Sequence, residues 1–102
     1  MSDELLVQYI LARNEEGLRI LVDRYSGLLL AVIKRNTQQI PDHVEECIDE
    51  VLYSIWSNIK RFDKNKNTFK NWICVIAEQV AFDIVNKYSN VKSNLSPGGN
   101  QL

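Results

Sequence analysis

Long stretches of this chain contain no helix-breaking residue, and this feature most constrains its fold. The only prolines are Pro41 and Pro97, and the glycines are confined to positions 17, 27, 98 and 99. Between these positions, apolar residues recur at spacings of three and four, which is the period of an amphipathic helix. No segment alternates with the period of a strand. The sequence therefore predicts an all-α fold, a small bundle of about four helices.

Polar residues at the expected helix starts divide the chain into these helices. The predicted helices span residues 3–13, 15–35, 43–62 and 69–88. Ser2, Asn14 and Thr68 are placed to cap the first, second and fourth helices. Asp42, followed three residues later by Glu45, predicts a capping box at the third. The polar segments between the helices are interpreted as loops.

Residues 1–90 form the predicted domain, and residues 91–102 a flexible linker or tail, because the chain turns polar from Ser89. Gly27 lies inside the apolar pattern of the second helix, where glycine costs about 1 kcal/mol relative to alanine. A close helix crossing is one explanation for it. The fourth helix has apolar residues beyond a single stripe, which indicates either a largely buried helix or a second apolar contact surface. These extra residues are Cys74, Val75, Phe82 and Val85.

The composition gives no support for an enzyme, a metal protein or a membrane protein. The single histidine, His43, has no nucleophile placed near it by the sequence, and no glycine-rich phosphate loop occurs. Cys47 and Cys74 lack zinc-ligand spacing and are interpreted as small buried apolar residues. No apolar run approaches the roughly 20 residues of a membrane span, and Asp3 and Glu4 stand where a signal peptide is basic. We therefore expect no catalytic site, no metal and no cofactor, in a cytoplasmic protein that does not contact membranes.

The formal net charge is only −1, but the charges are segregated by sign. Acidic residues crowd the first half of the third helix, and no lysine or arginine lies between Arg35 and Lys60. Such a face suggests a basic partner surface, and Tyr53 on its polar side is typical of an interface anchor. A merely solvated face is the alternative. The acidic residues are Asp42, Glu45, Glu46, Asp49 and Glu50.

A basic cluster follows at once, around the loop at 63–67. Its cations are Lys60, Arg61, Lys64, Lys66 and Lys70. Asparagines are interleaved with them, and Phe69 and Trp72 stand beside them. Cations pair with phosphates, amides hydrogen-bond to base edges, and aromatic rings stack on unpaired bases. The combination favours single-stranded nucleic acid, with a flexible charged loop in front of core aromatics as the alternative.

Several short motifs follow one another from Leu18 to about Lys87 with little gapping. They are Leu21 to Tyr25, Glu45 with Glu46, Asp49 to Leu52, Ile55 with Trp56, Phe62 with Asp63, Thr68 to Ile73, and Ile76 with Ala77 and Asp83. Together this series resembles region 2 of the extracytoplasmic-function (ECF) sigma factors, within the sigma-70 family. Each motif alone is a weak signal, whereas the ordered series is fairly specific.

The resemblance implies a domain that binds RNA polymerase and promoter DNA. The family's acidic helix docks on the basic clamp helices of the polymerase β′ subunit. The residues that this assigns to core-polymerase binding are Glu46, Asp49, Glu50, Tyr53 and Trp56. The following loop and helix melt the promoter −10 element and hold its single-stranded non-template strand. The residues that this assigns to DNA binding are Lys64, Lys66, Asn67, Phe69, Lys70, Trp72, Gln79 and Lys87. An anti-sigma factor is a further implied partner, which nothing in the sequence identifies.

The fourth helix departs from the family pattern. Glu78 and Gln79 stand where members usually carry Arg-Asn, and Asn86 and Lys87 stand where they usually carry two arginines. Both departures remove positive charge from a DNA-facing helix, which weakens phosphate contacts. They leave open a sigma-like protein that binds polymerase or a regulator without promoter-specific initiation. A helical interaction module unrelated to transcription is a third alternative.

Overall fold

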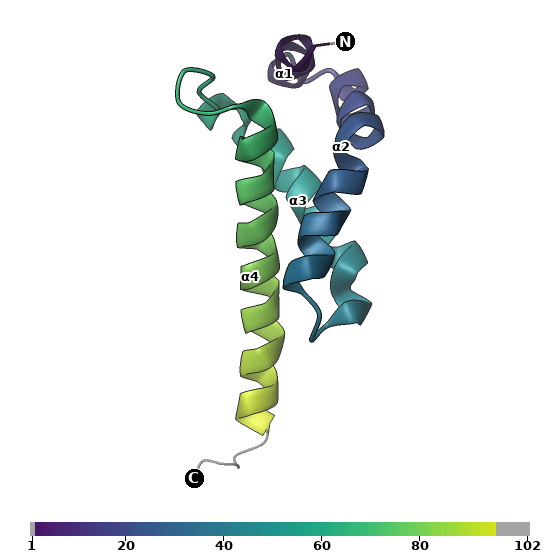
Figure 1. Cartoon of the computed structure of the whole chain (residues 1–102), viewed down its shortest axis with the longest axis vertical. Helices are drawn as coiled ribbons and strands as arrows, with labels where there is room; N and C mark the ends of the chain where they lie inside the picture. The colour runs from purple at the N-terminus through teal and green to yellow at the C-terminus, as the bar shows by residue number, and fades with distance from the viewer. Residues whose placement is uncertain (1, 96–102) are drawn as a thin grey trace.

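The computed structural model describes the backbone of residues 2–95 and the side chains of residues 2–89. This part of the chain is an all-α bundle, as the sequence predicts (Figure 1). Its helices are α1 (Asp3–Leu11), α2 (Glu15–Asn36), α3 (Val44–Asn58) and α4 (Phe69–Leu95), and the 3₁₀ turns η1 (Pro41–His43) and η2 (Ile59–Arg61) flank α3. No described helix combines the length and the apolar character needed to cross a membrane.

Three of the predicted N-caps are confirmed. In each, a side-chain oxygen accepts a hydrogen bond from a backbone N–H of the first turn. The bonds are Leu5 N–H to Ser2 Oγ at 3.2 Å, Glu16 N–H to Asn14 Oδ1 at 2.9 Å, and Asn71 N–H to Thr68 Oγ1 at 3.1 Å. Local sequence therefore sets the starts of α1, α2 and α4.

The predicted capping box at the third helix is wrong. Pro41 opens the turn η1, so α3 begins only at Val44, and no side chain caps either element. The far end also differs, because the backbone tightens into η2 before Phe62 instead of continuing as an α-helix. At the C-terminal end, α4 extends beyond the predicted residue 88 to Leu95. The division between a domain and a tail stays a prediction, and residues 96–102 lie outside the described residues.

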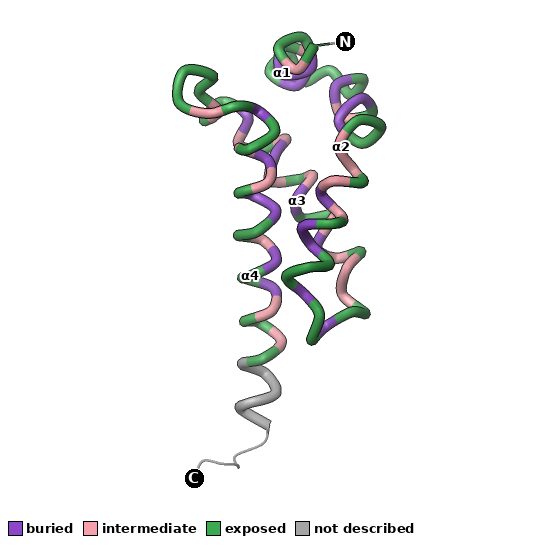
Figure 2. Tube along the Cα trace, in the orientation of Figure 1, coloured by how far each residue is buried: buried purple, intermediate pink, exposed green. Residues whose placement is uncertain are grey.

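The core lies where the apolar stripes of α2, α3 and α4 face one another, and α1 packs on α2 and on η2 (Figures 1 and 2). Large side chains that are fully buried come from all four helices. Among them are Leu6, Ile10, Leu21, Leu29, Ile33, Val51, Ile55 and Ile73. Each such side chain contributes about 1.5–3 kcal/mol through burial. Cys47 is buried as predicted, whereas Cys74 is only partly buried, and both thiols are free.

A close approach between α1 and α2 requires glycine at one position. A Cβ added at Gly17 would lie 2.9 Å from Tyr9 Cβ and from Ile10 Cγ1, both on α1. A Cβ added at Gly27 would meet nothing within 4 Å. The helix crossing considered for Gly27 is therefore wrong, and the close contact occurs at Gly17 instead.

Alanine substitutions at the two glycines are expected to change stability in opposite directions. Gly17→Ala forces α1 away from α2 and should lower the free energy of unfolding by about 1–3 kcal/mol. Gly27→Ala adds helix propensity at an open position and should raise it by roughly 0.5–1 kcal/mol. Urea unfolding followed by circular dichroism measures both. Similar values for the two variants would contradict the assigned packing.

Candidate protein and nucleic-acid interfaces

The solvent-facing side of α3 carries the predicted acidic face. Cys47, Val51 and Ile55 are fully buried on the opposite side of this helix. Residues about half a turn away must therefore face outward. Tyr53 is 66% exposed, although tyrosine is a large side chain that usually buries part of its ring. We call this outward face the acidic ridge, and its residues are Glu46, Asp49, Glu50 and Tyr53.

A surface hollow of about 380 Å³ lies between the acidic ridge and the start of α2. Its lining combines apolar side chains with two carboxylates. These residues are Glu15, Leu18, Asp49, Leu52, Tyr53 and Trp56. The structure thus brings together three of the predicted polymerase-binding residues. It adds Glu15 and Leu18, which sequence reasoning missed because their position depends on how α2 packs beside α3.

Arg13 fixes the end of α3 next to this hollow. Its backbone adopts a left-handed conformation, with φ 58°, where the chain turns from α1 into α2. The guanidinium group lies 5.2 Å from the centroid of the Trp56 ring and donates a hydrogen bond to the Trp56 carbonyl oxygen. Such a cation–π contact contributes roughly 0.5–1 kcal/mol at an exposed site. Trp56 therefore contacts the turn between α1 and α2 as well as lining the hollow.

Glu46, at the other end of α3, is bound within the molecule. Its Oε1 accepts a hydrogen bond from the Tyr88 hydroxyl at 2.7 Å and lies 3.2 Å from His43 Nδ1. Its Oε2 accepts a hydrogen bond from Lys87 Nζ at 3.4 Å. The rings of His43 and Tyr88 stack with centroids 3.8 Å apart. Glu46 and Lys87, which were predicted to bind different partners, thus contact each other in the cluster of His43, Glu46, Lys87 and Tyr88.

This cluster shifts the pKa values of its members. The hydrogen bond from Tyr88, followed by those from His43 and Lys87, lowers the pKa of Glu46 below its usual value. The same bond to the Glu46 carboxylate is the main reason why the pKa of Tyr88 is raised. Both shifts favour a protonated phenol bound to an ionised carboxylate. The cluster therefore links the start of α3 to the C-terminal half of α4 at every pH between the pKa of Glu46 and the pKa of Tyr88.

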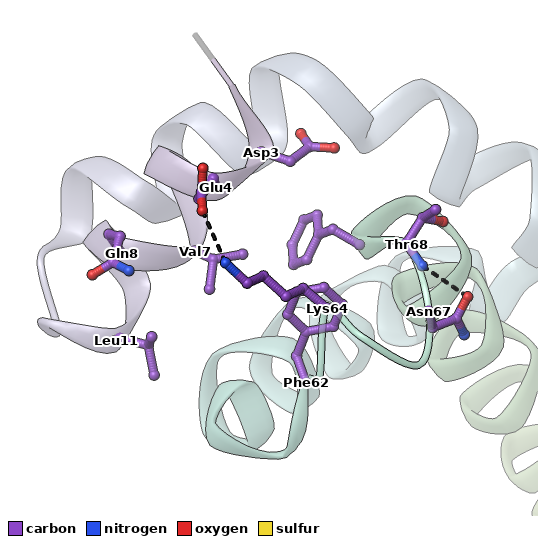
Figure 3. Close-up of a pocket in the computed structure, with 10 residues that line it drawn as sticks. Asp3, Glu4, Val7, Gln8, Leu11, Phe62, Lys64, Asn67 and Thr68 are labelled. Atoms are coloured by element: carbon purple, nitrogen blue, oxygen red, sulfur yellow. Dashed lines mark hydrogen bonds and ion pairs between the residues drawn. The ribbon is translucent and has the colours of Figure 1, made fainter.

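The basic loop after η2 borders a second pocket, of about 510 Å³ (Figure 3). One wall comes from α1 and the opposite wall from the loop and the start of α4. Apolar lining residues are Val7, Leu11, Phe62 and Phe69, and polar ones are Asp3, Glu4, Gln8, Lys64, Asn67 and Thr68. Figure 3 shows Lys64 extending across this space to Glu4, with Nζ and Oε2 3.2 Å apart. The structure thus gathers Lys64, Asn67 and Phe69 from the predicted DNA-binding set.

The aromatic residues beside the loop form part of the core. Ring centroids of Phe62, Phe69 and Trp72 lie 5.5–6.1 Å apart. Phe69 is only 3% exposed, and its ring also meets Tyr25 edge-on. Burial, followed by a hydrogen bond from the Tyr25 hydroxyl to Asp3, raises the pKa of Tyr25 to about 12. This aromatic packing holds Phe62 and Phe69, which line the pocket, against the core.

The remaining predicted DNA-binding residues do not all gather at the loop. Lys66 and Lys70 are exposed beside it. Gln79 and Lys87 instead line a groove between α3 and α4 that also contains Glu46, Glu50 and Asp83. Lys87 lies about 27 Å along α4 from the start of that helix, at about 1.5 Å per residue. The structure therefore separates these two residues from the loop cluster.

The outer face of α4 is partly apolar. Val75 is 45% exposed and Phe82 is 64% exposed. Of the two alternatives raised by the sequence, the second apolar surface is thus confirmed for these residues, while Cys74 and Val85 are partly buried. No lysine or arginine occurs between Lys70 and Lys87. This face therefore lacks the cations that a phosphate-binding helix normally presents.

A comparison with known protein families identifies a match. The family model for Sigma-70 region 2 matches residues 21–90, which is more than half of the chain. No curated protein and no solved structure matches the chain. The matched segment contains α3, the basic loop and most of α2 and α4, and it leaves α1 outside. The predicted sigma-70 resemblance is confirmed at this level, and the ECF subtype stays a prediction.

Replacing Glu46 with glutamine should remove a pH-dependent part of the stability. Because the pKa of Glu46 is lowered in the folded state, its contribution is present above the unfolded value of 4.5 and is lost as the pH falls through the folded value. Glu46→Gln should therefore melt below the native chain near neutral pH, and the difference should shrink in acid. Thermal melts from about pH 5 down to about pH 3, below the usual histidine range, measure this.

The neighbouring exposed Glu45 supplies the control, because Glu45→Gln removes the same charge outside the cluster. A Glu46→Gln difference that stays constant with pH would contradict the role of the ionised carboxylate.

Proposed function

The chain belongs to the Sigma-70 region 2 family, and we propose that it is the part of a sigma factor that binds core RNA polymerase and the promoter −10 element. The observation that carries the proposal is the acidic ridge of α3, with an exposed tyrosine at its centre and an apolar hollow beside it. By family resemblance, the partner of this ridge is the basic pair of clamp helices in the polymerase β′ subunit.

The proposed polymerase contact combines one aromatic anchor with flanking carboxylates. Tyr53 offers a large exposed ring, and such residues are frequent hot spots of protein interfaces. Asp49 and Glu50 flank it and attract basic side chains, which raises the association rate and sets the orientation. Trp56 lines the hollow that receives an apolar partner side chain. Glu46 contributes mainly by holding α3 against α4, because its two carboxylate oxygens already have partners inside the molecule.

The proposed DNA contact is the pocket beside the basic loop. Its apolar lining and amide rim suit one unpaired base, and Lys64, Lys66 and Lys70 suit the neighbouring phosphates. Binding an unpaired base in preference to a paired one shifts the promoter toward its melted form without any covalent chemistry. Trp72, which is partly exposed at the start of α4, extends this surface.

Motifs that carry the resemblance to the ECF sigma factors lie around these two sites, and we include this subtype in the proposal. Ile55 with Trp56 ends α3, and Phe69 with Trp72 begins α4. On this proposal the protein acts in the cytoplasm of a bacterial cell, together with these partners. An anti-sigma factor that covers the same surfaces stays a prediction of family membership.

Neutralising the acidic ridge should weaken polymerase binding strongly. The variant Asp49→Asn with Glu50→Gln removes two charges, and Tyr53→Ala removes the anchor, so each should weaken binding by an order of magnitude or more, which corresponds to about 1.4 kcal/mol or more. A titration of purified core polymerase, followed by fluorescence anisotropy of the labelled chain, measures the dissociation constants.

The matched control is Glu16→Gln with Asp23→Asn, which removes two exposed charges from α2. Equal losses of polymerase affinity in the two double variants would indicate that net charge, and not the acidic ridge, determines binding. No binding by the folded native chain would overturn the proposed function.

A second candidate function is favoured by the outer face of α4. Its exposed Val75 and Phe82, together with its lack of cations, suit a protein partner better than a DNA backbone. On this alternative the chain binds polymerase or a regulator but does not recognise promoters. The acidic ridge keeps the same role in both candidates, so polymerase binding alone does not separate them.

The salt dependence of DNA binding separates the two candidates. For a single strand, each lysine–phosphate contact contributes about 0.7 to the slope of log K against log salt. If the chain holds the −10 strand, Lys66→Ala should lower the slope by about this amount, and Lys87→Ala should lower it less because Glu46 already binds Lys87. If binding of DNA by the native chain does not depend on the salt concentration, the second candidate is favoured.

A further inference from the structure

The helix α1 builds one wall of the loop pocket although it lies outside the segment that matches the family. Val7 and Leu11 face Phe62 across the space, and Glu4 and Gln8 lie on the α1 side of the rim (Figure 3). Without α1, the basic loop would present an open surface instead of a pocket. Any ligand that enters the pocket must therefore contact α1 as well as the loop.

The position of α1 is fixed by the carboxylate of Asp3, its first residue. Asp3 Oδ1 accepts a hydrogen bond from Arg24 at 2.8 Å, and Asp3 Oδ2 accepts one from the Tyr25 hydroxyl at 2.6 Å. Leu6 and Ile10 are fully buried beneath the helix. Glu4, one residue further along, is 70% exposed and reaches across the pocket to Lys64, which is 71% exposed. The anchored helix thus holds a carboxylate next to the cation that the strand would use.

We propose that α1 is a strand-binding element in which Glu4 competes with nucleic-acid phosphate for Lys64, while Leu11 supports the bound base. This inference rests on the proposed function, because it concerns the regulation of the same pocket. In the free chain the carboxylate neutralises Lys64. When a strand binds, a phosphate replaces Glu4 as the partner of the ammonium group, and the Glu4 side chain turns into solvent.

The exposure of both partners supports an exchangeable contact. A salt bridge between exposed side chains is weak, because water screens it and ordering two long side chains costs entropy. A phosphate can therefore displace Glu4 at a small cost. Nearby Lys60, Arg61, Lys66 and Lys70 attract the strand to the same place, which favours a polyanion over a simple anion as the competitor.

The test measures binding of a fluorescent single-stranded oligodeoxynucleotide of mixed sequence to the full chain at low ionic strength. Glu4→Gln frees Lys64 and should tighten binding about two- to five-fold, as expected from the strength of an exposed ion pair. Leu11→Ala removes part of the apolar wall and should weaken binding about four- to fifteen-fold, since roughly one or two buried methylene equivalents are lost. Glu45→Gln is the matched control for the lost charge.

A double-variant comparison isolates the competition from general charge effects. In a Lys64→Ala background, Glu4→Gln should no longer change the affinity, because the cation for which Glu4 competes is absent. Circular dichroism melts of every variant verify that the bundle is folded.

The outcomes separate this inference from the proposed function. Tighter binding by Glu4→Gln that disappears in the Lys64→Ala background supports the inference. Native binding that Lys64→Ala weakens, with Glu4→Gln equal to Glu45→Gln and Leu11→Ala equal to the native chain, overturns the inference and leaves the proposed function in place. Absence of binding by every folded variant overturns the inference together with the DNA part of the proposed function, while the polymerase titration decides the other part independently.

Discussion

The burial of one side of α3 determines how the rest of the molecule can be used. Cys47, Val51 and Ile55 have no exposed surface, because α2 and α4 close over them. With 3.6 residues per turn, burying these positions forces Asp49, Glu50 and Tyr53 to the outside. The acidic ridge is therefore a consequence of core packing. A substitution that rotated α3 within the core would displace the ridge even if every acidic residue were kept.

Both ends of α3 are held by polar contacts from distant parts of the chain. Arg13 binds Trp56 at one end, and Tyr88 with Lys87 binds Glu46 at the other. A surface whose helix is tethered at both ends loses less conformational entropy when a partner binds than an untethered one, so more of the interaction energy appears as affinity. The loop pocket follows α3 directly through η2, and α1 contacts both η2 and α2. The ridge and the pocket are thus connected through the same set of packed helices.

Local sequence signals predicted the helices and three caps, because apolar period and capping depend on residues a few positions apart. The same reasoning failed at Asp42, where Pro41 favours a 3₁₀ turn over the capping box. Motif order also predicted the family, since it needs no geometry. The sequence could not show that Glu46 contacts Lys87, 41 residues away, or that α1 closes the loop pocket. Those contacts depend on how the helices cross, so residues predicted for separate partners turned out to contact one another.

The separation of charge along the chain explains how a protein with net charge −1 can present surfaces for partners of opposite sign. From Tyr53 to Arg61 the chain advances about 14 Å through α3 and η2, which exceeds the screening length of about 8 Å at physiological salt. The acidic ridge therefore repels a strand at the loop only weakly. Glu4, in contrast, lies 3.2 Å from Lys64, well within that length. The potential at the pocket is thus influenced more by α1 and the loop than by the ridge.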